Sequence, residues 1–295
     1  MQRDEPAAGS LYLVGTPIGH LGDLSPRAQA LLRAVDVIAC EDTRHSGQLL
    51  NNLQAKGRRL SFHQHNTRTR LPQLMASLAD GLSVAVISDA GLPGISDPGE
   101  ELAAAAHLAE HPVICIPGPC AATAALVSSG LPSGRFCFEG FLPTRGKERS
   151  RRLEQIAKEQ RTTVLYEAPH RLLNLLEELQ EHCGGERPLL VARELTKRHE
   201  EQIGATVNQA LMHFRNKRPQ GEFTVVLGGA STPERKIPDD SELRERLRQL
   251  QSDGMSASQA ARQLAEDSGI SKRQLYSLLH QTCLLYTSPS PRDSV

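Results

Sequence analysis

The first 130 residues alternate short apolar runs with amphipathic helical patterns. Runs rich in β-branched residues end near positions 16, 42, 89 and 119, and stretches with the helical spacing of apolar residues separate them. Short apolar strands interleaved with helices are typical of a parallel sheet that is covered on both faces. This alternation predicts an α/β domain over residues 1–130.

The pattern changes after a Gly/Ser/Pro-rich junction at residues 128–134. Further apolar runs, separated by helical segments, predict a second α/β domain with a mixed sheet over residues 131–230. A polar linker then leads to three helical segments over 241–283, and the last two have the spacing of a helix-turn-helix motif. Residues 284–295 differ in composition from the rest, and we expect a non-native or disordered tail there.

Serine residues mark the expected helix starts. Ser25 stands before a proline, which is a favoured N-cap and first-turn pair. Ser256 or Ser258 suits the start of the second tail helix, and Ser271 suits the start of the third.

Composition narrows the class of protein. Of the 295 residues, 39% are hydrophobic and 23% are charged, which is ordinary for a globular chain long enough to form two domains. No apolar run reaches the roughly 18 residues of a membrane span, and the first ten residues have no signal-peptide core. We therefore expect a cytoplasmic protein. The six cysteines are scattered without a C-x-x-C pair, which predicts reduced thiols and no metal site.

Charge is balanced overall and uneven locally. The 34 basic and 34 acidic residues exclude a strongly basic nucleic-acid coat but allow local patches. Lys56–Arg70 contains no acidic residue, and Thr144–Arg152 contains one glutamate. Each stretch is either an RNA contact or an ordinary solvated face. In the tail, Lys272 and Arg273 open the last helix, which favours contact with nucleic acid over a packing role.

Two histidines are the strongest candidates for metal ligands. His63 and His65 are two residues apart, so both imidazoles would lie on one face of a strand. No third ligand stands near them in the sequence, and surface or RNA-facing histidines are the favoured interpretation.

Loops rich in glycine and proline follow three of the predicted strands. Ligands of open parallel sheets bind at the carboxyl ends of the strands, so these loops predict one shared small-molecule site. Glycine lets the backbone approach a ligand, and proline fixes the shape of the loop. The G-x-G-x-x-G and P-loop patterns are both absent, which disfavours a phosphate cradle and leaves adenosyl ligands without phosphates open. The loops are "GTPIGHLGD", "SDAGLPGISDPG" and "PGPCAATAAL".

Charged residues also follow two of the strands. Asp42 and Arg44 lie in "CEDTRHS", and Glu194 and Lys197 lie in "ARELTKRHEE". Such groups serve either as helix caps and ion pairs, for which Asp42 suits as an N-cap, or as groups that position a hydroxyl nucleophile at the rim of the crevice. The residues alone leave both interpretations open.

The ordered set of motifs resembles a known family. It is similar to bacterial small-subunit rRNA methyltransferase I, a branch of the tetrapyrrole methylases, over roughly residues 11–280. The motifs are "LYLVGTPIGHLGD", "EDTRHS", "SDAGLPGISDPG", "IPGPCAATAAL", "RFCFEGFLP", "YEAPHRL", "ARELTKRHEE" and "GEFTVVLGG". The resemblance implies a homodimer that holds S-adenosylmethionine in the cleft between two α/β domains. It also implies 2′-O-methylation of a cytidine in the decoding centre of 16S rRNA.

The resemblance implies site residues as well. His20 and Leu92 stand where the family commonly has Asn and Thr, and both replacements are compatible with a site in which backbone atoms make the contacts. For the acceptor side we predict Asp42, Arg44, Glu194 and Lys197, whose charges suit a hydroxyl nucleophile and its phosphates. The cofactor-binding positions are Pro17, Ile18, Asp89, Ala90, Leu92, Cys120, Ala121, Tyr166 and Ala168.

Other functions are compatible with the same crevice. A methylase of a corrin or sirohaem precursor would need a deep cleft for a large anionic macrocycle, and the tail domain and "EDTRHS" argue against it. A non-catalytic RNA-assembly factor could retain S-adenosylmethionine as a structural ligand. A nicotinamide oxidoreductase, the default function for a parallel sheet, is the third alternative. The fold alone does not choose among these functions.

Overall fold

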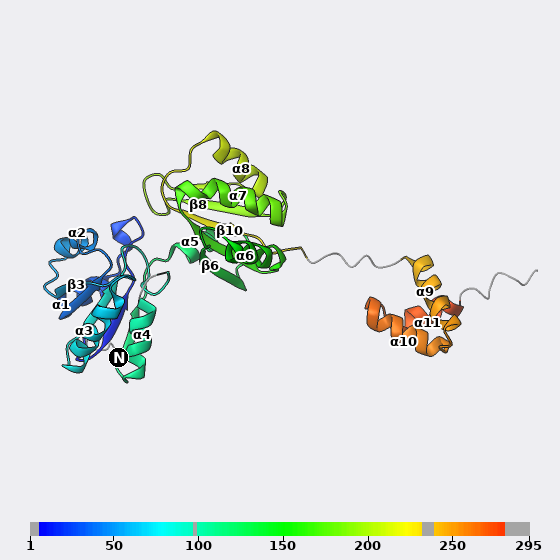
Figure 1. Cartoon of the computed structure of the whole chain (residues 1–295), viewed down its shortest axis with the longest axis horizontal. Coiled ribbons are helices and arrows are strands. Elements are labelled where there is room, and N and C mark those ends of the chain that lie inside the picture. Colours follow the sequence, from blue (N-terminus) through cyan, green and yellow to red (C-terminus); the bar gives the residue numbers. More distant parts are fainter. Residues whose placement is uncertain (1–5, 97–98, 232–238, 281–295) are drawn as a thin grey trace, which may run out of the picture. The chain divides into compact units, whose positions relative to one another are not determined.

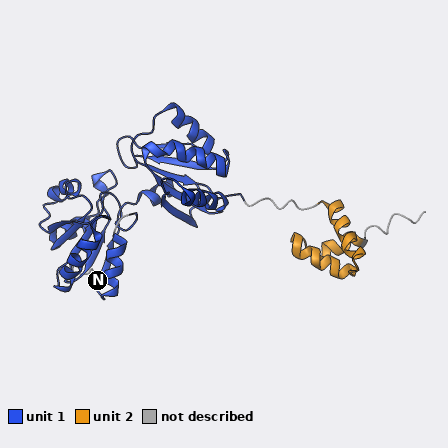
Figure 2. Ribbon diagram, in the orientation of Figure 1, with its two compact units in different colours: residues 1–231 blue, residues 232–295 orange. Residues whose placement is uncertain are grey.

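The computed structural model describes residues 6–96, 99–231 and 239–280. The chain divides into two compact units, residues 1–231 (unit 1) and residues 232–295 (unit 2), as Figures 1 and 2 show. Unit 1 holds two sheets with their helices, and unit 2 is helical. The predicted fold class, two α/β domains and a C-terminal helical region, is confirmed. The exact domain boundaries stay predictions.

The first sheet has five parallel strands in the order β3-β2-β4-β1-β5. Its central strands β2 and β4 are buried along their whole length, as the apolar runs predict. The strands are β1 Leu11–Val14, β2 Val37–Cys40, β3 Arg58–Ser61, β4 Val84–Ile87 and β5 Val113–Ile116.

Helices cover both faces of this sheet, because alternate residues of each strand point to opposite sides. Tyr12 packs in one core with α1 and α2, and its neighbour Leu11 packs in the other core with α3 and α4. Ser25 caps α1 as predicted, because its side chain accepts a hydrogen bond from the Ala28 amide. The helices are η1 Leu21–Asp23, α1 Pro26–Ala34, α2 His45–Asn52, α3 Thr67–Ala79 and α4 Gly99–Leu108.

The second sheet is mixed, in the order β6-β7-β10-β8-β9. β6 pairs with β7 in parallel, and the other neighbours are antiparallel. The short strand β9 was not anticipated from the sequence. The strands are β6 Phe136–Phe141, β7 Thr162–Glu167, β8 Leu189–Arg193, β9 Glu201–Ile203 and β10 Phe223–Leu227.

The helices α6 Lys147–Lys158, α7 Pro169–Cys183 and α8 Val207–Asn216 pack on one face of the second sheet. The opposite face receives α5 Ala121–Ser128, whose small buried residues meet Val164 and Val226. This helix precedes the predicted junction between the domains, yet it packs against the second sheet. It therefore joins the two halves of unit 1 beside the strand-end loops.

Unit 2 consists of α9 Asp240–Ser252, α10 Ala257–Ser268 and α11 Lys272–His280 around a small apolar core. Ser256 is the cap of α10 and forms a capping box with Gln259. Ser271 accepts a hydrogen bond from the Gln274 amide and caps α11. The predicted helix, turn and helix are thus present, whereas the predicted tail at 284–295 and positions 281–283 lie outside the described residues.

None of the helices in the described ranges is both long enough and apolar enough to cross a bilayer.

Two glycines fix the spacing of the strand-end loops of the first sheet. Gly15 follows β1 and Gly118 follows β5, and their backbones lie against each other. A Cβ built on Gly15 would lie 2.6 Å from Gly118 Cα, and one built on Gly118 would lie 2.8 Å from Gly15 Cα. Only glycine fits at both positions without moving a loop.

Gly15→Ala and Gly118→Ala are expected to lower the free energy of unfolding by about 1–3 kcal/mol, because the new methyl group meets backbone. Gly134→Ala is the matched control, since a Cβ at Gly134 meets nothing within 4 Å. Urea unfolding curves of the three variants measure the effect. Equal stability of all three would show that the loops yield without cost.

Candidate active site

Loops from the carboxyl ends of β1, β4 and β5 meet in one crevice. The Thr16 amide donates to the Gly91 carbonyl at 2.9 Å, and the Gly91 amide donates back to the Thr16 carbonyl at 3.2 Å. β1 lies between β4 and β5 in the sheet. The strands β2, β3 and β4 lie on one side of β1 and β5 lies on the other, so the direction in which strands are added reverses at β1. A crevice at such a switch point is the usual ligand site of an open parallel sheet.

The first of these loops also contacts the second sheet. A Cβ on Gly19 would lie 2.5 Å from Lys197 Cγ, so the loop after β1 touches the loop after β8. The His20 amide donates to Thr196 Oγ1 at 3.0 Å. On the other side of the crevice, the Tyr166 hydroxyl accepts from the Ala122 amide at the start of α5, at 3.1 Å. The two halves of unit 1 are therefore joined on both sides of the crevice.

His20 has a local structural role. Its Nδ1 accepts a hydrogen bond from the Gly22 amide at 3.1 Å and caps η1. The asparagine that the family commonly has there is also a good cap, since its side-chain oxygen accepts the same bond. His20 therefore differs from the residue common in the family but keeps a side-chain acceptor for the Gly22 amide.

Two adjoining cavities lie between the sheets. One, of about 340 Å³, is lined by α2, by the loops after β1 and β4, and by Asp89 and Lys197, and we name it the polar cavity after its polar and charged residues. The apolar cavity, of about 360 Å³, is lined by the β4 and β5 loops, by Tyr166 and by the start of α7. Ile18, Ala90 and Glu222 line both and mark the junction.

The nine positions predicted to bind the cofactor all line these cavities. Pro17 and Asp89 line the polar cavity, and Ile18 and Ala90 line both. The remaining five line the apolar cavity: Leu92, Cys120, Ala121, Tyr166 and Ala168. Their contact with a cofactor stays a prediction.

Asp42 and Arg44 form a pair on the surface. Arg44 Nη2 lies 3.0 Å from Asp42 Oδ2, and 91% of the Arg44 side chain is exposed. The side-chain hydrogen bond from Arg44, together with its backbone amide, lowers the pKa of Asp42 to about 2. As the capping interpretation expects, Asp42 Oδ1 accepts a hydrogen bond from the Arg44 amide at 2.8 Å, and the Asp42 carbonyl accepts one from the Ser46 amide at 3.0 Å. The same carboxylate also binds the Arg44 guanidinium, and Arg44, which directly precedes α2, makes no side-chain cap bond of its own. Neither residue is among those that line the polar cavity or the apolar cavity.

Asp42 reaches the crevice through its backbone. Its amide donates to Asp89 Oδ1 at 3.2 Å, which ties the end of β2 to the end of β4. The Asp89 carboxylate therefore holds two strand-end loops together as well as lining the polar cavity.

Glu194 and Lys197 come together in the loop after β8. Lys197 Nζ lies 2.9 Å from Glu194 Oε1 and 3.0 Å from Glu222 Oε2. Glu194 has a φ of +51° and Thr196 has one of +63°, which is sparsely populated for residues other than glycine. The loop is held in this shape by a hydrogen bond from the Glu222 amide to Glu194 Oε1, at 2.9 Å.

The charge of Lys197 follows from these contacts. Burial by itself lowers the pKa of Lys197, but the hydrogen bonds to Glu194 and Glu222 outweigh burial and raise it. Burial likewise acts to raise the pKa of Glu194, and its bonds to the Glu222 amide and Lys197 lower it overall. Lys197 is therefore a cation at neutral pH and does not serve as a base.

Glu222 is the site residue that sequence reasoning missed. It stands inside the "GEFTVVLGG" motif, but that motif gave no sign of a role for this position. The antiparallel pairing of β10 with β8, in which Phe223 faces Arg193, sets Glu222 beside Glu194 and Lys197. Its side chain is 74% exposed and belongs to both cavities.

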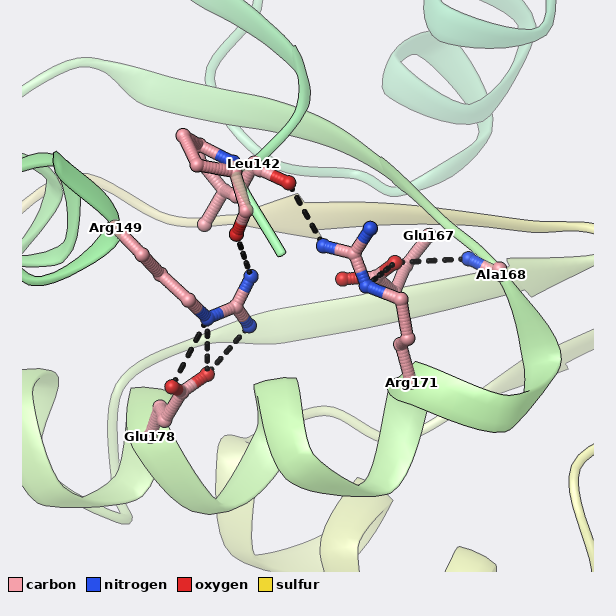
Figure 3. A network of polar contacts seen from close by, with 7 residues as sticks. Leu142, Arg149, Glu167, Ala168, Arg171 and Glu178 are labelled. Atoms are coloured by element: carbon pink, nitrogen blue, oxygen red, sulfur yellow. Dashed lines mark hydrogen bonds and ion pairs between the residues drawn. The ribbon is translucent and has the colours of Figure 1, made fainter. Parts of the chain in front are cut away.

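A buried network holds the start of α7 at the edge of the apolar cavity (Figure 3). Glu167 Oε1 accepts from the Ala168 amide at 2.9 Å and lies 3.1 Å from Arg171 Nε. Burial raises the pKa of Glu167, against the influence of Ala168 and Arg171. Arg149 is also buried and binds Glu178 at 3.0 Å. Part of the basic stretch at 144–152 is thus structural.

His63 and His65 follow β3 in the turn before α3, with ring centres 6.0 Å apart. The expectation that they share one strand face is wrong, because β3 ends at Ser61. Among the residues that the structure describes, no group of three or more potential metal ligands is found.

Comparison with known proteins agrees with this architecture. The family described as "Tetrapyrrole (Corrin/Porphyrin) Methylases" matches residues 10–211, and the "RsmI C-terminal HTH domain" matches residues 237–282. "Ribosomal RNA small subunit methyltransferase I" of Synechocystis sp. is 51% identical over 92% of this chain and 97% of its own. The protein of the same name from Thermotoga maritima is 46% identical over 75% of this chain and 99% of its own.

Among solved structures, uroporphyrin-III-C-methyltransferase from Thermus thermophilus is similar, with a TM-score of 0.52 and 25% identity. The match covers 75% of this chain and 94% of that one.

Replacing Arg44 with alanine is expected to raise the pKa of Asp42 from about 2 toward 3.8, because the carboxylate loses the guanidinium donors and keeps only the backbone amide of residue 44. Asp42 has a lowered pKa, so its contribution to stability is present above the unfolded value and lost as the pH falls through the folded value. In the variant that contribution is therefore smaller, and its loss is complete at a higher pH. Side-chain carboxyl NMR titration measures the shift, and an unchanged pKa would show that Arg44 does not hold the carboxylate.

Proposed function

The chain belongs to the tetrapyrrole methylase family and, within it, to small-subunit rRNA methyltransferase I, and from this premise we propose that it methylates the RNA of the small ribosomal subunit. Its cofactor is S-adenosylmethionine. The proposed acceptor is the 2′-hydroxyl of a cytidine in the decoding centre of 16S rRNA. The observation that carries the proposal is the pair of adjoining cavities, one with mostly apolar residues in its wall and one with several polar and charged residues, with Glu222 at their junction.

The apolar cavity suits an adenosyl ligand. Its walls include Leu92, Cys120 and Tyr166, and it has no glycine-rich phosphate loop. A volume of about 360 Å³ is within the range of small-molecule sites. S-adenosylmethionine has no phosphate, and when bound it supplies an activated methyl group on a positively charged sulfur. The residues present therefore fit this cofactor.

The polar cavity suits a ribose hydroxyl. Lys197 is a fixed cation there, and a cation stabilises the negative charge that develops on a hydroxyl oxygen as it reacts. The Glu222 carboxylate, 3.0 Å from Lys197 Nζ, can accept the hydroxyl proton. Glu194 holds Lys197 in place. Positioning of the two reactants supplies much of the remaining acceleration.

The exposed ion pair of Asp42 and Arg44 has a different role in the proposal. The pKa of Asp42 is about 2, so this carboxylate is a poor proton acceptor at neutral pH. Arg44 is 91% exposed and can exchange Asp42 for an RNA phosphate. Phosphate contacts position a nucleic acid without reading its sequence. Asp42 and Arg44 are therefore proposed to grip the acceptor strand.

Unit 2 is proposed to bind RNA. Its match to the HTH domain and the basic start of α11 support this role. The relative from Thermotoga maritima is matched over 99% of its length by 221 residues of this chain, which is close to the size of unit 1. Methyl transfer is therefore assigned to unit 1, and unit 2 adds affinity for the substrate. The homodimer also stays a proposal, which sedimentation equilibrium would check.

A methyl-transfer assay distinguishes the proposed function from the alternative functions. The purified chain is incubated with labelled S-adenosylmethionine and either small subunits from a strain that lacks the modification or a precorrin-type macrocycle. Transfer to the subunits, mapped to the cytidine by mass spectrometry of nucleosides, supports the proposal. Transfer to the macrocycle would favour the tetrapyrrole methylase, and binding of cofactor and subunits without any turnover would favour an assembly factor.

Lys197→Met and Glu222→Gln are each expected to lower kcat about 10²-fold, because charge stabilisation or proton acceptance is lost at the reacting oxygen. The cofactor dissociation constant stays unchanged, since the apolar cavity is intact. Single-turnover methyl transfer at saturating cofactor measures the effect, and Lys158→Met, on the exposed end of α6, is the control. Wild-type turnover in either variant removes that residue from the chemistry.

Deleting residues 232–295 is expected to leave cofactor binding unchanged and to raise the KM for small subunits about 10²-fold. A second binding module on a linker raises affinity by its effective concentration, and that gain is lost on deletion. Calorimetry with the cofactor and steady-state kinetics with subunits measure the two quantities. An unchanged KM would contradict an RNA-binding role for unit 2.

A further inference from the structure

One face of α2 lines the polar cavity with three polar side chains. His45, Gln48 and Asn52 are three and four residues apart, so they lie on the same side of the helix. All three are exposed to the cavity rather than packed in the core. We name this set the α2 polar face.

The amides of this face are available to a ligand. In the described part of the chain, the side chains of Gln48 and Asn52 have no hydrogen-bond partner within the protein. Asn51 is different: its Oδ1 accepts from Arg59 Nη2 at 2.9 Å, and it does not line the cavity. Of the two neighbouring asparagines on α2, Asn51 is therefore hydrogen-bonded within the fold, whereas Asn52 faces the cavity.

The helix that carries these side chains is firmly held. Leu50 is buried in the core that α2 shares with the sheet, and Ser46 is buried where α2 borders the cavity. The Ser46 amide donates to the Asp42 carbonyl at 3.0 Å, and this bond closes the first turn against the end of β2. The α2 polar face is therefore fixed relative to Lys197 and Glu222, which line the same cavity.

Side-chain amides match the polar edges of nucleobases. Each amide offers one acceptor oxygen and two N–H donors, which is the complement of a Watson–Crick edge. Enzymes that do chemistry on a base take it out of the base stack and read its edge in a pocket, and the same kind of pocket can hold the base of a nucleotide whose ribose reacts. Unpaired bases of RNA are recognised in the same way.

We propose that the α2 polar face is a subsite for one unstacked nucleobase of the acceptor strand, bound through hydrogen bonds to its polar edge. The inference rests on the proposed function and adds where the acceptor base is held. Gln48 and Asn52 contact the base edge, and His45 closes the subsite at the start of the helix. The ribose of the same nucleotide then faces Lys197 and Glu222 across the cavity.

The test compares two substrates with the full-length protein. One is small subunits from a strain that lacks the modification, and the other is the same subunits with the methylated nucleotide mutated to adenine. The variant Gln48→Ala/Asn52→Ala is expected to lose roughly 5- to 100-fold in kcat/KM on the native subunits, the range expected for lost base contacts. Its preference for the native base over adenine falls toward one. The cofactor dissociation constant stays at the wild-type value.

Controls separate this inference from a structural effect and from the proposed function. Asn51→Ala changes the same residue type on the same helix and is expected to behave as wild type. The isosteric pair Gln48→Glu/Asn52→Asp keeps the shape of the cavity and loses the donors, so it should lose the base preference as well. Equal loss on both substrates, or wild-type kinetics in the variants, would overturn the subsite. Absence of methylation by the wild-type protein would instead overturn the proposed function.

Discussion

The contact between the backbones of Gly15 and Gly118 sets the geometry on which the site depends. The loops after β1 and β5 lie so close that a Cβ on either glycine would fall within 2.8 Å of the other backbone. This contact lets the loop after β4 pair with Thr16 and lets α5 begin beside the crevice. A wider separation of the loops after β1 and β5 would move apart the residues that line both cavities, among them Ile18 and Ala90.

The second sheet completes the site by bringing charge to that junction. Its loop after β8 holds Glu194 and Thr196 with positive φ, and it meets the first sheet at Gly19. Strain of this kind persists only where the surroundings fix the backbone, and it is common at functional sites. The result is that Lys197, a charged group between two carboxylates, stands beside a cavity that the first sheet largely builds.

Periodicity and turn chemistry predicted the parallel sheet, the mixed sheet and the cap at Ser25, because these depend on local sequence. The same reasoning missed Glu222, whose role comes from the pairing of β10 with β8, far apart in the chain. It left Asp42 open between a helix cap with an ion pair and an acceptor-side group, and the structure shows the carboxylate bonded to both the amide and the guanidinium of Arg44. Pairing between strands that are far apart in the chain is not encoded in any short stretch of sequence.

The central claim is that the apolar cavity holds the cofactor and presents its reacting end at Glu222. A crystal structure of the full-length protein with S-adenosylhomocysteine tests this most directly. We expect the adenosyl group to lie against Leu92 and Tyr166, with the sulfur at the junction formed by Ile18, Ala90 and Glu222. An adenosyl group in the polar cavity, against α2, would contradict both the assignment of the cavities and the proposed path of the acceptor.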